Sequence, residues 1–260
     1  MLDPFDKFEV KDSGFEDDRA IYALDKFFRL CADNNPSIVE LLFVPDKCTN
    51  FKTEKWDAVL ENKHLFLSKN LRYRYTGFAV AQLRKLQRHR EWFQNPPDHK
   101  PTRKEYGLKD SPLVSEGSLQ NVLGVPKELF LPQYHEELVR ERAYRDAKKR
   151  WDNFYQWQTT RNPKRKGAEE LYGYDTKCAI NIFRLLSEGE SLLLTGNIEF
   201  PLPNADWLIQ IKQGFYTYEQ LLEMTEGMEE RFNHLYEISP LPKSPNRNKL
   251  TELYYELVLN

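Results

Sequence analysis

The sequence predicts an α+β fold that is predominantly α-helical, with a short N-terminal β-hairpin followed by a body of many helices. Three observations lead to this prediction. Polar and apolar residues alternate over residues 7–11 and then stop alternating. From Ala20 onward, apolar residues recur with the period of a helix. Prolines then interrupt the chain at intervals that suit the ends of separate helices.

The hairpin is predicted from residues 7–11, a turn at Asp12-Ser13-Gly14 and a return strand over residues 15–18. A lone two-stranded hairpin is barely stable in water. The pattern therefore predicts that further strands belong beside it.

The helices are placed by their apolar faces and boundary residues. Ile21, Leu24, Phe28 and Cys31 mark the face of the first helix, and Asn35 and Pro36 are suited to the cap and first turn of the second. Short helical turns are predicted within residues 56–66. Longer helices are predicted over residues 70–92, 133–160, 168–187, 204–213, 217–237 and 246–258. A loop or insertion is expected at about 96–132, and a small hairpin at Gly196-Asn197, between residues 192–195 and 198–200.

Composition narrows the class of protein. The 260 residues are 30% charged and 40% apolar, which is typical of a helix-rich soluble protein. The net charge of −2 gives no overall field that would attract nucleic acid. Three widely spaced cysteines argue against a disulfide framework and favour the reducing cytoplasm. No apolar run approaches the roughly 20 residues of a membrane span, so no membrane partner is expected.

The segment from Tyr172 to Lys177 combines a chain reversal with charged and aromatic side chains. Gly173 permits the turn, and Asp175 or Thr176 can cap the helix that follows. Lys177 stands at the positive end of that helix, where a cation gains nothing from the helix dipole. Its position suggests an anionic partner such as a phosphate. The alternative is a helix start packed by tyrosines, with a solvated lysine.

The predicted helix over residues 70–92 is basic at Arg84, Lys85, Arg88 and Arg90. Such a face can line a groove for nucleic acid or a triphosphate. Aromatic residues that can stack on bases accompany it at Tyr73, Tyr75, Phe78 and Trp92. The alternative is an ordinary solvated helix face.

An ordered set of segments resembles a known family. Arg161-Asn162-Pro163, residues 172–177, Arg184-Leu185-Leu186 and Gly189 are similar to the C-terminal signature of a family of predicted nucleotidyltransferases in the DNA polymerase beta superfamily, a family linked to RNA repair. Other segments match in the same order, at residues 22–27, 35–43, 66–69, 77–83, 211–214, 218–222 and 239–242. The resemblance covers nearly the whole chain and is loose from about residue 96 to 160.

The resemblance implies a division of the chain and a reaction. Residues 1–45 would hold part of a nucleotidyltransferase sheet and the first helices, and residues 46–260 a helical substrate-binding body. The family reaction would transfer a nucleotidyl group from a nucleoside triphosphate to RNA or another acceptor. Mg²⁺ ions held by carboxylates would assist it.

The resemblance also implies site residues. The third metal-binding carboxylate is expected at Asp18, with Glu16 next because strand alternation places both on one face. The alternative is that Asp17 or Asp18 caps the first helix. Residues expected at the nucleotide or RNA are Lys26, Lys69, Arg84, Arg88, Tyr172, Tyr174, Asp175 and Lys177.

The sequence departs from the superfamily in one respect. A Gly-Ser motif followed by an Asp-x-Asp pair should precede all the segments above, and neither is present in the expected context. One carboxylate cannot hold two magnesium ions. The chain as given is therefore expected to be a truncated, inactive member of the family. The alternative is a non-catalytic helical module that binds RNA or nucleotide.

Overall fold

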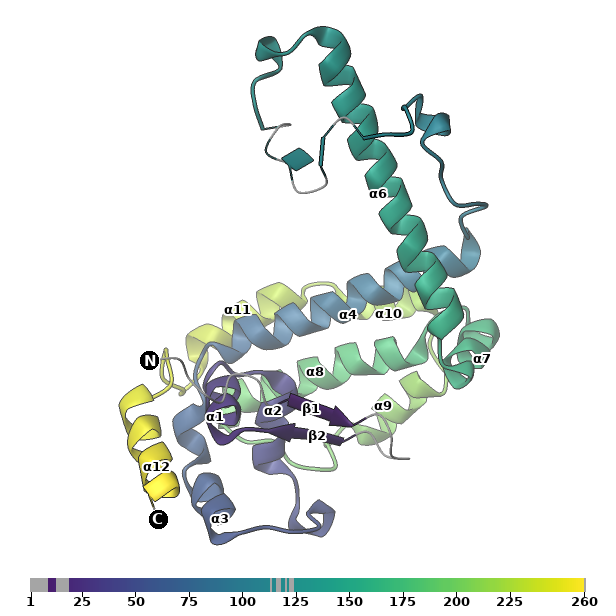
Figure 1. Ribbon diagram of the computed structural model, residues 1–260. Coiled ribbons are helices and arrows are strands. Elements are labelled where there is room, and N and C mark those ends of the chain that lie inside the picture. The colour runs from purple at the N-terminus through teal and green to yellow at the C-terminus, as the bar shows by residue number, and fades with distance from the viewer. Residues whose placement is uncertain are drawn as a thin grey trace. The chain divides into compact units, whose positions relative to one another are not determined.

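A computed structural model describes residues 9–12, 19–112, 114–115, 118–119, 121 and 124–259 (Figure 1). The chain forms two compact units, one made of Met1–Leu86 with Thr176–Asn260 and the other of Gln87–Asp175. The division of the chain at residue 45 was implied by the family resemblance, is not tested by these two units, and stays a prediction. The predominantly helical α+β class is confirmed.

The hairpin is present, with its second strand later than predicted. Strands β1 (Glu9–Asp12) and β2 (Arg19–Tyr22) pair antiparallel, with Val10 opposite Ile21 (Figure 1). The assignment of Ile21 to a helix face was wrong, because it lies in β2 and is 65% exposed. The predicted return strand over residues 15–18 lies outside the described residues.

Helix α1 (Leu24–Ala32) turns sharply into α2 (Pro36–Val39) at a buried asparagine. Asn34 has a positive φ of 54°, and its side-chain amide donates to the carbonyl of Phe66 at 2.7 Å. The Ser68 hydroxyl in turn donates to the Asn34 side chain at 2.7 Å. As predicted, Asn35 caps α2, accepting from the backbone of Ser37, and Pro36 opens it. This network ties the first helices to the segment before α4.

The remaining elements of the N-terminal half are mostly short. They are the 3₁₀ turns η1 (Glu40–Phe43), η2 (Asp46–Cys48) and η3 (Lys63–Phe66), helix α3 (Glu54–Glu61), and the long helix α4 (Leu71–Gln94). Helix α4 ends before Asn95-Pro96-Pro97, as the sequence predicts. It supplies residues to both units, with the boundary between Leu86 and Gln87.

The second unit contains the long helix α6 (Pro132–Thr160), helix α7 (Pro163–Tyr172), and the short turns η4 (Lys104–Tyr106) and η6 (Lys127–Leu129). Glu141 of α6 is 1% exposed and accepts from Arg103 at 2.7 and 3.0 Å. Arg145, one turn along α6, also donates to Glu141 and reaches the carbonyl of Val114 at 2.7 Å. These ion pairs hold the predicted loop against α6.

The C-terminal part of the first unit consists of α8 (Thr176–Thr195), α9 (Ala205–Lys212), α10 (Tyr218–Thr225), α11 (Met228–Ile238) and α12 (Arg247–Leu259). The small hairpin predicted over residues 192–200 was wrong, because α8 continues to Thr195. The single helix predicted over residues 217–237 is two helices, separated at Gly227, whose φ is 70°. Thr217 and Gln220 form a capping box that starts α10.

The core of the first unit is apolar and aromatic. Its fully buried side chains include Phe66, Leu67, Leu71, Tyr75, Ile182, Leu192, Leu193 and Phe232. Helix α8 packs against α9 and α11, and α1 packs against α2 and α12. Among the helices described, none has both the length and the apolar character needed to cross a membrane.

Candidate functional site

The predicted metal carboxylates, Glu16 and Asp18, lie outside the described residues. Their surroundings are partly described, since Asp12 of β1 pairs with Arg19 of β2 and β2 leads directly into α1. The alternative role of Asp17 or Asp18 as the cap of the first helix was wrong, because α1 begins at Leu24 and Ala23 occupies its cap position.

Two of the predicted nucleotide-binding lysines, Lys26 and Lys69, lie in the first unit, each near an aromatic ring. Lys26 of α1 is half-buried, with Nζ 5.7 Å from the centre of the Tyr22 ring. Lys69 precedes α4, with Nζ 5.3 Å from the Tyr236 ring and 3.3 Å from the carbonyl oxygen of Glu237.

The predicted basic residues of α4 are on its surface. Arg84 and Arg88 are both exposed, and the Arg88 guanidinium lies 5.5 Å from the centre of the Trp92 ring. Tyr73 is 55% exposed and can contact a base, whereas Tyr75 is fully buried. The proposed stacking role of Tyr75 was therefore wrong.

The predicted signature segment divides into buried and exposed residues. Gly173 ends α7 in the left-handed conformation, with φ 75°, so the turn predicted there is confirmed. Tyr174 and Asp175 are each 1% exposed. Tyr172 is half-buried, and Lys177 is exposed in the first turn of α8. Tyr172 and Lys177 are thus the side chains of the segment that reach the surface.

Asp175 belongs to a buried cluster of charged side chains in the second unit. His89 Nδ1 lies 3.5 Å from Asp175 Oδ2 and 3.8 Å from Glu169 Oε1. Arg161 forms an ion pair with Glu169, and Arg165 lies 3.9 Å from Asp175. The pKa of Glu169 is raised to about 7, mainly by burial; the Asp175 carboxylate adds to the rise, whereas Arg161 and Arg165 oppose it.

Aromatic rings shield this cluster from water. The His89 ring stacks on Trp92, with centres 5.8 Å apart, and lies 5.5 Å from Trp157. The Arg161 guanidinium lies 4.2 Å from the centre of the Trp157 ring. Two members of the signature, Arg161 and Asp175, therefore occur in one shielded ionic network of the second unit.

A second charge cluster lies in the first unit, around the buried side chain of Glu188. Arg184 of α8 forms ion pairs with Glu40 and, at 2.8 Å, with Glu188. The pKa of Glu188 is raised to about 7, mainly by burial; Arg184 opposes the rise and Glu40 adds to it. The ion pair with Arg184 gives Glu40 a structural role.

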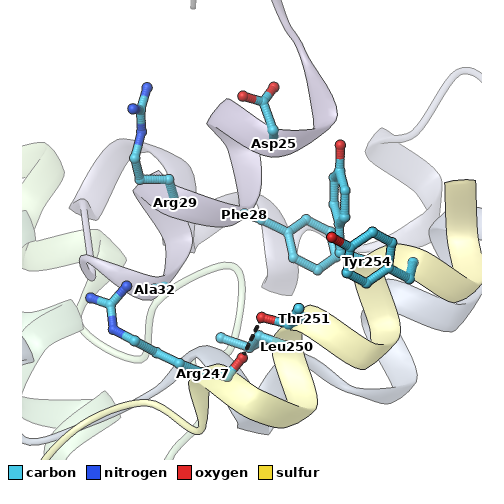
Figure 2. Close-up of a pocket in the computed structure, with 9 residues that line it drawn as sticks. Asp25, Phe28, Arg29, Ala32, Arg247, Leu250, Thr251 and Tyr254 are labelled. Atoms are coloured by element: carbon cyan, nitrogen blue, oxygen red, sulfur yellow. Dashed lines mark hydrogen bonds between the residues drawn. The ribbon is translucent and has the colours of Figure 1, made fainter. Parts of the chain in front are cut away.

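The structure also reveals a cavity that the sequence did not indicate. It has a volume of about 220 Å³ and lies between α1 and α12 (Figure 2). Asp25 and Arg29 come from α1, whereas Arg247 and Tyr254 come from α12. No local motif joins these residues, because they come from opposite ends of the chain. Of the site residues predicted from the sequence, Lys26 comes closest to this cavity, because it follows Asp25 in the chain.

Comparison with known proteins supports the resemblance. The model of the RNA repair pathway DNA polymerase beta family matches residues 6–105, which is fewer than half of the 260 residues. The matched stretch contains Glu16, Asp18, Lys26, Lys69, Arg84 and Arg88. No curated protein and no solved structure matches the chain significantly.

Proposed function

We propose, on the premise that residues 6–105 belong to the RNA repair pathway DNA polymerase beta family, that this chain serves metal-dependent nucleotidyl transfer to RNA. The family match is the observation that carries the proposal. The acceptor is an RNA end, and the donor is a nucleoside triphosphate. Catalysis of this type depends mainly on positioning and charge neutralisation.

The predicted site residues that the structure describes are assigned either to binding RNA or nucleotide or to positioning. Arg84 and Arg88 contact phosphates of the RNA backbone, because both are exposed cations on α4. Lys26, Lys69, Tyr172 and Lys177 are assigned to nucleotide or RNA. Tyr174 and Asp175 are buried, so we assign them to positioning: they hold the turn that presents Tyr172 and Lys177.

Mg²⁺ is the proposed cofactor and would supply neutralisation of the developing phosphate charge. Magnesium prefers carboxylate and water oxygens in octahedral geometry. Among the residues described, neither unit on its own brings together three side chains that could ligate a metal ion. These residues do not fit a magnesium site, so we derive no catalytic step through the ion. The predicted ligands remain Asp18 and Glu16.

The proposal is tested by RNA binding and by transfer in the same preparation. The Arg84→Gln/Arg88→Gln double variant should bind a short single-stranded RNA about tenfold more weakly at low salt. The slope of the logarithm of its binding constant against the logarithm of the salt concentration should become shallower by the equivalent of about one to two phosphate contacts. Fluorescence anisotropy over a salt series measures both. Lys212→Gln, at the exposed end of α9, is the matched control and should bind like the parent chain.

Transfer is measured by extension of labelled RNA with each nucleoside triphosphate and Mg²⁺. Extension that EDTA abolishes supports the enzyme and contradicts the expectation from the sequence that the chain as given is inactive. RNA binding without extension agrees with that expectation and with the alternative, a non-catalytic RNA-binding helical module. If the chain neither binds nor extends RNA, both functions are refuted.

A further inference from the structure

We propose that single-stranded RNA runs along one face of helix α4, with a base stacked on Tyr73 and phosphates at Arg74 and Arg84. All of these residues belong to the first unit. The inference deepens the proposed function and rests on it for the choice of RNA. It adds that the RNA is unpaired where it is bound, and it names the side chain that distinguishes a single strand from a duplex.

Two tyrosines from different helices form the aromatic part of the site. Tyr73 of α4 and Tyr236 of α11 meet edge-on, with ring centres 6.0 Å apart. Tyr73 is 55% exposed, and Tyr236 is half-buried beside it. Every base has a π face, so an exposed ring of this kind can stack on a base of any identity. Tyr73 is therefore assigned to the base, with Tyr236 supporting its edge.

A cation holds each of the two rings. The Arg72 guanidinium lies 4.5 Å from the centre of the Tyr73 ring, and its Nε is shielded from solvent. Lys69 Nζ lies 5.3 Å from the centre of the Tyr236 ring and donates to the carbonyl oxygen of Glu237 at 3.3 Å. Cation–π contacts restrict the rings before RNA arrives, which lowers the entropic cost of binding. Arg72 and Lys69 therefore serve the site by holding its rings.

The phosphates are assigned to Arg74 and Arg84, whose side chains are both exposed on α4. Arg74 follows Tyr73 directly. Arg84 lies about three turns further along the helix, roughly 16 Å away, on the same side as Tyr73. Guanidinium groups suit phosphate because their planar donor fork can bind two oxygens at once. The spacing lets one strand contact the ring and both arginines.

Small residues lie on the helix face between Tyr73 and Arg84. Gly77 and Ala81 are exposed, and their spacing continues the same side of α4. A Cβ added at Gly77 would meet nothing within 4 Å, so the space over this turn is open. The sugar–phosphate chain can therefore approach the helix between its two ends without a large side chain in the way.

The charges of this part of the chain favour the same ligand. Residues 62–90, which include the first turns of α4, contain lysines and arginines but no aspartate or glutamate. An acidic peptide or a duplex would use the arginines and leave Tyr73 without a partner, because the bases of a duplex are already stacked and paired. Single-stranded RNA uses both the cations and the ring.

The test is fluorescence anisotropy of the full chain with a short labelled RNA, either single-stranded or annealed to its complement. Tyr73→Ala should bind the single strand about tenfold more weakly, with an unchanged salt slope because no cation is lost, and should bind the duplex like the parent chain. Tyr73→Phe keeps the ring and should restore the affinity. Tyr255→Ala, which removes a tyrosine of α12 that is 57% exposed, is the matched control and should bind like the parent. A thermal melt of each variant checks that it is folded.

Two further measurements separate charge from stacking. Arg74→Gln should weaken the binding of both RNAs and make the salt slope shallower by about one phosphate contact. An RNA that carries the fluorescent base 2-aminopurine at one position after another reports stacking directly. Its fluorescence should fall on binding to the parent chain at one or two positions, and this fall should be absent with Tyr73→Ala.

The inference is overturned if Tyr73→Ala binds the single strand as tightly as the parent chain does, or loses affinity for single strand and duplex equally. If that happens while Arg84→Gln/Arg88→Gln still weakens RNA binding, the proposed function stands without this site. If Tyr73→Ala loses the single strand as expected but the parent chain extends no RNA, the site on α4 stands and nucleotidyl transfer fails. A parent chain that binds neither RNA overturns both.

Discussion

Replacing Gly189 by alanine is expected to destabilise the first unit by about 3 kcal/mol, the upper end of the usual cost of overpacking a core. A Cβ at this position would lie 2.8 Å from Cβ of Tyr75 and 2.9 Å from Cε1 of Phe232. Both neighbours are fully buried. The Tyr75 Cβ is fixed to the backbone of α4, so relief of the clash requires helices α4 and α8 to separate. Urea unfolding followed by circular dichroism measures the change.

Gly77→Ala is the matched control for this experiment. Gly77 also lies within a helix of the first unit, and an added Cβ there meets nothing within 4 Å. Alanine in an unobstructed helix position stabilises by about 0.5–1 kcal/mol. The two substitutions should therefore change stability in opposite directions. A Gly189→Ala chain as stable as the parent would show that α8 and α4 are not packed as described.

The sequence was sufficient for elements whose signals are local. The helices predicted over residues 70–92 and 133–160 correspond to α4 (Leu71–Gln94) and α6 (Pro132–Thr160). Proline marks the boundary in both cases. The Asn35 cap was also predictable, because capping depends on one side chain and the amides that follow it.

Errors arose where tertiary packing determines the structure. Leu192, Leu193 and Leu194 form a short apolar run, which strands and buried helix ends share, so periodicity could not distinguish them. Leu192 and Leu193 are fully buried, and α8 continues through them. The break at Gly227 was missed for a related reason, since glycine is tolerated within helices as well as between them.

The same difference between local signals and tertiary packing applies to the candidate site. Arg84, Arg88 and Lys177 could be identified as exposed cations from the helical pattern alone. The contact of Asp175 with His89 could not, because the two residues are far apart in the sequence and no motif joins them. The cavity lined by Asp25 and Arg247 depends on the packing of α12 against α1, which no local pattern records.

Replacing Arg184 by methionine is expected to destabilise the chain by about 1–2 kcal/mol at pH 8, because it leaves the buried carboxylate of Glu188 without its cation. Glu188 is fully buried and pairs with Arg184 at 2.8 Å, and Glu40 pairs with the same guanidinium. Methionine retains most of the apolar contacts of the arginine side chain, so the loss is mainly electrostatic. Urea unfolding at several pH values measures it.

The pH dependence distinguishes this mechanism from a general packing defect. The pKa of Glu188 is raised to about 7 in the folded chain, from an ordinary value of 4.5. The folded state therefore binds more protons between these values than the unfolded state, and the contribution of Glu188 to stability falls as pH rises from about 4.5 to about 7. Without Arg184, whose charge lowers this pKa, the decline should continue above pH 7. The destabilisation caused by Arg184→Met should thus be small at pH 5 and large at pH 8.

Glu188→Gln provides the decisive comparison. A neutral amide of the same shape has no proton to lose, so the Arg184→Met/Glu188→Gln chain should be more stable at pH 8 than Arg184→Met alone and should lack the Glu188-dependent slope. Glu40 then remains, but its side chain is 26% exposed and can be hydrated. An equal loss of stability at pH 5 and pH 8, unchanged by the second substitution, would show that Arg184 acts through packing alone and that Glu188 carries no buried charge.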